Sequence, residues 1–189
     1  MNCSRLISLL FLLSLALCLA ACSVRPTEQI ERAEKAKKQA TDEHADFFAP
    51  DDWKAAETSY NDAQKKLDQG SYGDAQTLLL RAKTRYEKAR DLAKGKREDA
   101  VREIKGIQGT ADARCKALKE GIDKNSKKLS AKRKGELEAA CKELEEKIAK
   151  SKTSLANEKF DDAKYQAQTA LREVWEAQKD LESAVGGKK

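Results

Sequence analysis

The fold is decided by residues 73–125, GDAQTLLLRAKTRYEKARDLAKGKREDAVREIKGIQGTADARCKALKEGIDKN. Most apolar residues in this stretch follow one another at steps of three or four, which is the spacing of a single stripe on an α-helix. The stripe consists of Ala75, Leu79, Ala82, Tyr86, Ala89, Ala93, Ala100, Ile104, Ile107, Ala111, Cys115, Leu118 and Ile122. Gly95 and the segment 106–109 are the places where such a helix could kink or break. We therefore predict one long amphipathic helix against which the other segments pack.

The composition favours helices over any other architecture. Of the 189 residues, 37% are charged and 5% are aromatic, which is too polar for a large globular core. The regular apolar spacing is not typical of disorder. Pro26 and Pro50 are the only prolines, so the rest of the chain contains no strong helix breaker. We predict an all-α fold without strands, an elongated bundle of antiparallel helical hairpins built around the long helix.

A pattern in residues 53–93 recurs 88 positions later, which indicates an internal repeat. The matching pairs are Leu67 and Leu155, Tyr72 and Phe160, Asp74 and Asp162, Ala75 and Ala163, Ala82 and Ala170, Tyr86 and Val174, and Ala89 and Ala177. The alternative is a chance match between two alanine-rich helices. We divide the chain after the leader into residues 27–93, with the N-terminal helices and a first hairpin, and residues 94–189, with the second hairpin region.

Two cysteines fall on facing stripes of the predicted helices. When the helices before and after a turn near residues 125–128 are aligned antiparallel, Cys115 and Cys141 lie at almost the same level. Two closely packed helices can bring their α-carbons within the 4.4 to 6.8 Å that a disulfide requires. We expect a disulfide between them; the alternative is a pair of small buried thiols.

The N-terminus has the features of an export signal. Residues 1–21 combine the basic Arg5 with an apolar run that is too short for a comfortable membrane span. The run ends in Leu-Ala-Ala-Cys, which resembles the lipobox of bacterial lipoproteins. That resemblance implies a signal peptide over 1–21, lipidation of Cys22, a tether over 22–26, and attachment to the membrane by the N-terminal lipid. The Ser23 that follows implies an outer-membrane location with the protein on the periplasmic face.

Basic residues are concentrated in the middle of the chain. Residues 94–137 contain 14 basic and 7 acidic side chains, whereas the flanking segments are nearly neutral. A basic surface of this kind suits an acidic protein, peptidoglycan carboxylates or anionic lipids, and the alternative is a solvated face that confers solubility. Nucleic acid is a poor candidate because no aromatic residues are interleaved for base stacking. The candidate contact residues are Lys124, Lys127, Lys128, Lys132, Arg133 and Lys134.

A second candidate contact surface lies on the last predicted helix. Leu171 and Trp175 are beside its core stripe, where they either form a small exposed docking face or pack on a third helix. Catalytic signals are scarce: His44 is the only histidine, no glycine-rich phosphate loop is present, and the mature thiols are not spaced as Cys-x-x-Cys. We therefore expect no enzyme activity, no metal site and no cofactor.

One further resemblance concerns residues 45–93. Ala49-Pro50-Asp51-Asp52-Trp53, the turn Gln69-Gly70-Ser71-Tyr72-Gly73-Asp74-Ala75, and then Ala82, Tyr86 and Ala89 resemble an uncharacterised family of helical bacterial lipoproteins. Members occur alone or fused to outer-membrane-protein-A-like domains, and the turn is similar to the helix junction of tetratricopeptide repeats. The resemblance implies an envelope location and no known activity. We expect a non-catalytic structural or adaptor lipoprotein with an envelope protein as partner; the alternative is a binder of anionic envelope polymers or lipids.

Overall fold

The computed structural model of the chain describes residues 24–186. The predicted signal peptide and the predicted lipidation site Cys22 lie outside these residues. Within them, 89% of the residues are helical and none forms a strand, which confirms the all-α prediction. The helices are α2 (Thr27–Asp42), α3 (Ala45–Phe48), α4 (Pro50–Asp68), α5 (Tyr72–Lys124), α6 (Ala131–Ala156) and α7 (Phe160–Gly186).

The long helix predicted from the apolar stripe is α5. It is 53 residues long and continues through Gly95, Gly106 and Gly109, so none of the glycines ends it. Almost all residues of the predicted stripe are buried; Ala100 and Ile107 are half-buried. Burial of this stripe against neighbouring helices, more than intrinsic propensity, stabilises a helix that contains internal glycines.

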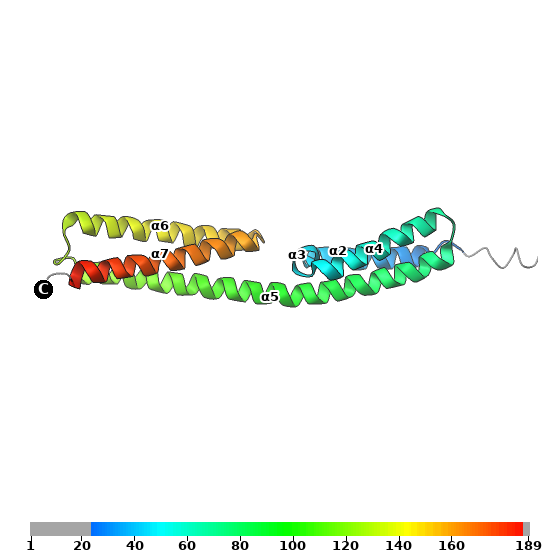
Figure 1. Ribbon diagram of the computed structural model, residues 1–189, viewed down its shortest axis with the longest axis horizontal. Helices are drawn as coiled ribbons and strands as arrows, with labels where there is room; N and C mark the ends of the chain where they lie inside the picture. Colours follow the sequence, from blue (N-terminus) through cyan, green and yellow to red (C-terminus); the bar gives the residue numbers. More distant parts are fainter. Residues whose placement is uncertain (1–23, 187–189) are drawn as a thin grey trace, which may run out of the picture. The chain divides into compact units, whose positions relative to one another are not determined.

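The chain forms two compact units, Met1–Arg97 and Glu98–Lys189. In each unit three long helices lie side by side (Figure 1). Unit 1 contains α2, α3, α4 and the first part of α5, and unit 2 contains the rest of α5 with α6 and α7. The helix α5 therefore supplies the third long helix of unit 1 and the first helix of unit 2.

The core of unit 1 consists of small residues around one buried tyrosine. Ala33 of α2, Ala63 of α4 and Leu79 of α5 pack together, and Tyr86 is fully buried. Its ring lies 5.3 Å, centroid to centroid, from the ring of Trp53. These contacts agree with the predicted antiparallel alignment of α4 and α5. Alanines allow the helix axes to approach closely, so a narrow core still excludes water.

Two helix boundaries in unit 1 have local causes. The helix α2 ends at Asp42, because His44 adopts a left-handed conformation with φ of 54° and separates α2 from α3. The helix α4 begins at Pro50, after Ala49. Proline suits the first helical position since the N–H that it lacks would have no partner there. Asp51 and Asp52 lie in the first turn, where the helix dipole favours negative charge.

Unit 2 has a larger apolar core to which all three helices contribute. The core residues are Ala111, Cys115, Leu118, Ile122, Leu137, Cys141, Leu144, Ile148, Ala170, Val174, Ala177 and Leu181. One buried polar contact interrupts this core. The Gln108 amide donates to the Ser151 hydroxyl at 2.8 Å, and that hydroxyl donates to the carbonyl of Ala163 at 2.7 Å. A single side chain of α6 thus links α5 to α7.

The turns that precede α5 and α7 have the same conformation at the 88-residue offset of the predicted repeat. In the first, Gly70 N–H donates to the carbonyl of Leu67 and Ser71 N–H to that of Lys66. In the second, the equivalent bonds run from Glu158 to Leu155 and from Lys159 to Ser154. This is the Schellman pattern, which requires a left-handed residue after the helix. The φ values are 71° at Gly70 and 57° at Glu158.

Candidate interaction surfaces

The basic surface predicted from the sequence is centred on the turn between α5 and α6, residues 125–130. Its backbone is internally hydrogen-bonded: the amides of Lys128 and Leu129 donate to the carbonyl of Asn125. The Asn125 side chain donates to the carbonyl of Gly121, and Leu129 packs half-buried against the core of unit 2. The turn is therefore held in place by the fold, so its lysines project from an ordered backbone.

The six predicted contact residues fall into two groups. Lys124, Lys127, Lys128 and Lys132 are exposed, and none makes an ion pair with any residue that the structure describes. In contrast, Arg133 is half-buried and binds both Glu136 at 2.9 Å and Asp180 at 3.2 Å. Lys134 lies 3.6 Å from Glu138. The sequence identified the cluster but not this division, because the neutralising partners come from the next turn of α6 and from α7.

The start of α6 places positive charge where a helix dipole disfavours it. Every other helix in the described part of the chain has at least one acidic residue in its first turn. The first turn of α6 has none and instead carries the consecutive basic residues Lys132, Arg133 and Lys134. Ser130 caps this helix by accepting a hydrogen bond from the Arg133 amide at 3.2 Å. The basic side chains are electrostatically unfavourable for the helix, by about 0.3 to 1 kcal/mol each at an exposed position.

The second predicted surface consists of Leu171 and Trp175, one turn apart on α7. Leu171 is half-buried and packs on the core of unit 2, whereas 49% of Trp175 is exposed. The Lys179 ammonium lies 3.6 Å from the centroid of the Trp175 ring, close enough for a cation–π contact. Leu171 therefore packs inward, whereas about half of Trp175 is exposed.

The corresponding positions of unit 1 are charged. At the 88-residue offset, Leu171 corresponds to Lys83 and Trp175 to Glu87. Lys83 and Glu87 form an ion pair at 2.9 Å. The same place on the same type of helix thus carries a half-buried ion pair in unit 1 and an apolar leucine–tryptophan pair in unit 2. Packing within a three-helix unit does not require an apolar pair there, since unit 1 forms without one.

The disulfide predicted between Cys115 and Cys141 is absent, and both cysteines are free thiols. The prediction that they lie together is correct: the Cys115 sulfur is 3.8 Å from the carbonyl oxygen of Cys141. The Cys115 thiol donates this hydrogen bond to the backbone of α6. Burial raises the pKa of Cys115, with a further contribution from Glu145, and raises the pKa of Cys141 to about 11, with a further contribution from Cys115.

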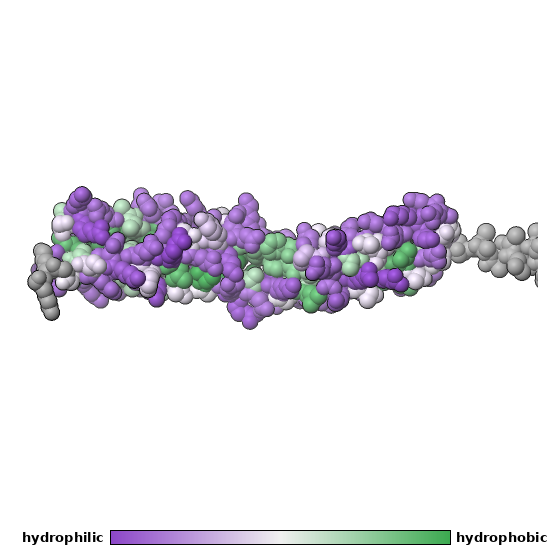
Figure 2. All heavy atoms as spheres, in the orientation of Figure 1, coloured by the Kyte–Doolittle hydropathy of each residue, from purple (hydrophilic) through white to green (hydrophobic). Residues whose placement is uncertain are grey.

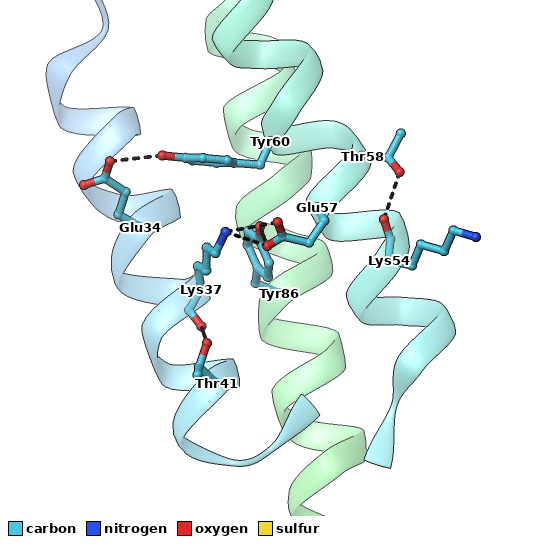
Figure 3. A network of polar contacts seen from close by, with 8 residues as sticks. All are labelled: Glu34, Lys37, Thr41, Lys54, Glu57, Thr58, Tyr60 and Tyr86. Atoms are coloured by element: carbon cyan, nitrogen blue, oxygen red, sulfur yellow. Dashed lines mark hydrogen bonds and ion pairs between the residues drawn. The ribbon is translucent and has the colours of Figure 1, made fainter. Parts of the chain in front are cut away.

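Sequence reasoning missed a polar network inside unit 1 (Figure 3). The Lys37 ammonium lies 2.8 Å from the Glu57 carboxylate, and the hydroxyl of buried Tyr86 donates to the same carboxylate. The hydroxyl of Tyr60 donates to Glu34 at 3.0 Å. Burial, followed by Glu57, raises the pKa of Tyr86 far above its ordinary value. These side chains come from α2, α4 and α5 and bind one another. Such a network of satisfied polar groups holds the helices in position.

Other types of site find little support in the residues that the structure describes. Among them, no group of three or more histidine, cysteine, aspartate or glutamate side chains could hold a metal ion. None of the described helices is long and apolar enough to cross a membrane. Figure 2 shows that hydrophilic residues cover most of the visible face and that hydrophobic ones form only small patches.

Comparison of the chain with protein-family models, with curated proteins and with solved structures found no match. The resemblance to helical bacterial lipoproteins therefore stays a prediction that depends on the residues quoted for it.

Proposed function

We propose that the chain is an outer-membrane lipoprotein that is anchored through Cys22, faces the periplasm and acts as a non-catalytic structural or adaptor module. The leader and the Leu-Ala-Ala-Cys sequence support the location. The described helices support the role, because Trp175 of α7 and the lysines around the turn between α5 and α6 are exposed and available for contact.

One observation carries the adaptor function: Leu171 and Trp175 occupy positions where unit 1 has the Lys83–Glu87 ion pair. An exposed tryptophan beside a leucine is unfavourable in water, and tryptophan is enriched among the residues that dominate protein–protein binding energy. The fold tolerates an ion pair at this place, so the apolar pair is better explained by binding to an envelope protein than by stability.

A second candidate function is binding of an anionic envelope polymer or lipid by the turn between α5 and α6. The four exposed lysines without ion-pair partners favour it. The two functions differ in their response to salt. Binding by exposed lysines should weaken steeply as ionic strength rises, whereas an apolar contact at Trp175 should not.

The adaptor function is tested by photocrosslinking in cells. A photoreactive amino acid replaces Gln168, which is exposed and lies one turn before Leu171 on α7. We expect a discrete protein adduct. The variant with Leu171→Lys and Trp175→Glu reproduces the ion pair of unit 1 and should abolish the adduct without unfolding the protein.

The matched control exchanges a pair on unit 1. Lys83→Gln with Glu87→Gln removes the equivalent ion pair there and should leave the adduct at position 168 unchanged. The adaptor proposal fails if no protein is attached at position 168, or if the adduct survives the change at Leu171 and Trp175.

A further inference from the structure

We propose that the turn between α5 and α6 binds the surface of an anionic phospholipid membrane, with Lys124, Lys127, Lys128 and Lys132 contacting the phosphate groups. This inference specifies the ligand of the second candidate function, and it does not depend on a protein partner at Trp175. It rests on three features of the turn. Its lysines have no ion-pair partners among the described residues, the first turn of α6 is basic, and its one arginine is already bound to acidic side chains.

The first feature is the set of four exposed lysines without ion-pair partners among the described residues. Elsewhere in unit 2 several lysines are neutralised across helices, as when Lys119 pairs with Glu145 at 2.6 Å and Lys152 with Asp112 at 2.6 Å. The four lysines of the turn have no ion pair among the described residues, as is also true of Lys105, Lys116 and Lys142, but the four are gathered between residues 124 and 132. Their charge is therefore available to an external anion.

The second feature is the basic first turn of α6. The other described helices begin with at least one acidic residue, as α4 does with Asp51 and Asp52. Lys132 lies in the first turn of α6, where the helix dipole makes a positive charge unfavourable. An acidic residue at this position would make α6 more stable, so the lysine is better explained by a function than by folding.

The third feature concerns how the turn can bind an anion. An arginine would bind a single carboxylate or phosphate in a fixed geometry through two parallel hydrogen bonds. The arginine of the turn, Arg133, is already bound to Glu136 and Asp180. Lysines on flexible side chains act as point charges, which suits phosphates spread over a surface. No aromatic residue is present in the segment 121–138 to stack on a sugar ring.

The shape of the turn fits the same ligand. Four lysines around a helix-to-helix turn can reach several headgroups together, and each basic residue near an anionic leaflet strengthens binding by roughly fivefold. An open hollow beside them could receive a headgroup; it is lined by Lys127, Lys128, Leu129, Ser130, Arg133 and Ala184. Binding of this kind should weaken as the salt concentration rises, because salt screens the attraction between the lysines and the phosphates.

The test is co-sedimentation with lipid vesicles, using the mature chain with Cys22→Ser so that no acyl chain contributes. Vesicles contain phosphatidylcholine alone or with about one third phosphatidylglycerol. We expect binding only to the anionic vesicles and its loss in about 0.5 M salt. Replacing Lys127, Lys128 and Lys132 by Glu should reduce the partition coefficient more than a hundredfold.

Two further variants exclude indirect effects. Lys132→Glu alone should weaken vesicle binding at least fivefold and yet raise the midpoint of thermal unfolding by about 1 to 4 °C, since it corrects the start of α6. A loss of binding in a more stable protein cannot be attributed to unfolding.

The control variant replaces Lys105, Lys116 and Lys142 by Glu. These lysines are also exposed on unit 2, and the total change in charge is the same as in the triple variant of the turn.

The control variant should bind the vesicles nearly as well as the parent chain, because charges farther away than about 8 Å are screened. The proposal is overturned if the control and the turn variant lose binding equally. It is also overturned if neutral and anionic vesicles bind alike, or if the chain sediments with insoluble peptidoglycan and not with anionic vesicles. The crosslinking experiment probes α7, whereas the vesicle experiment probes the turn between α5 and α6. The adaptor proposal and the membrane-binding proposal can therefore fail independently.

Discussion

Gly70 and Glu158 occupy the same position in two turns of the same conformation, 88 residues apart, and both have a left-handed backbone. Each follows the end of a helix, α4 or α6, and the amide of each donates the inner hydrogen bond of the Schellman pattern, to the carbonyl of Leu67 or of Leu155. Glycine adopts this conformation without strain, whereas a residue with a side chain pays about 1 to 2 kcal/mol. The second turn is therefore the more strained of the two.

This difference predicts opposite effects of two substitutions. Gly70→Ala should lower the free energy of unfolding by about 1 kcal/mol, because no atom crowds the position and only the backbone conformation is penalised. Glu158→Gly should raise it by up to about 1 kcal/mol. Denaturant unfolding measures both. A stabilising Gly70→Ala, or an equal loss of stability in both variants, would contradict the equivalence of the turns.

The buried pair of Gln108 and Ser151 gives a second prediction. Ser151→Ala leaves the Gln108 amide without its partner in the core, which should cost about 1 to 3 kcal/mol. Unit 1 has Ala63 at the position equivalent to Ser151 and packs it against Ala33 and Leu79. An apolar solution therefore exists for this fold. The double variant Gln108→Leu with Ser151→Ala should be more stable than Ser151→Ala alone; simple additivity of two losses would refute this interpretation.

The buried thiols predict a loss of stability at alkaline pH. The ordinary pKa of a thiol here is 9.0, and the folded Cys141 has a pKa of about 11. Above pH 9 the unfolded chain releases a thiol proton that the folded chain retains, so the unfolded state binds fewer protons and stability falls as pH rises. The loss should extend from about pH 9 to pH 11, and Cys115, whose pKa is also raised, adds to it.

The measurement is denaturant unfolding at a series of pH values, compared with the variant in which both cysteines are replaced by alanine. The free energy of unfolding of the variant should fall less steeply over the same pH range, since lysine and tyrosine titration affects both proteins equally. Alkylation supplies a second check: the folded protein should react slowly, and the unfolded protein should take up reagent at both Cys115 and Cys141. Identical pH profiles would show that the thiols do not contribute.

The sequence predicts the helices of this protein well because the apolar spacing of α5 is regular and few residues interrupt it. It also predicts that Cys115 lies near Cys141. It does not reveal the break at His44, which contains neither glycine nor proline. The burial of Gln108 is equally hidden, since a polar residue on a stripe finds its partner only in another helix.

The candidate surfaces could be predicted only as sets of residues. The lysines around the turn are visible in the sequence, but the pairing of Arg133 with Asp180 depends on how α7 packs against α6. The unfavourable start of α6 is a sequence signal that pattern analysis can find, because Ser130 marks the cap and three basic residues follow it closely. The exposure of Trp175 required the arrangement of the three helices of unit 2.

An envelope adaptor and a membrane-binding turn both presuppose export, so both proposed roles depend on the lipid anchor. The decisive measurement is the intact mass of the protein, and of its N-terminal peptide, purified from a bacterial membrane fraction. We predict a chain that begins at Cys22 and carries acyl chains on that residue, and a Cys22→Ala variant that retains the leader or is unacylated. A wild-type chain that begins at Met1, or at an unmodified residue, would contradict the account.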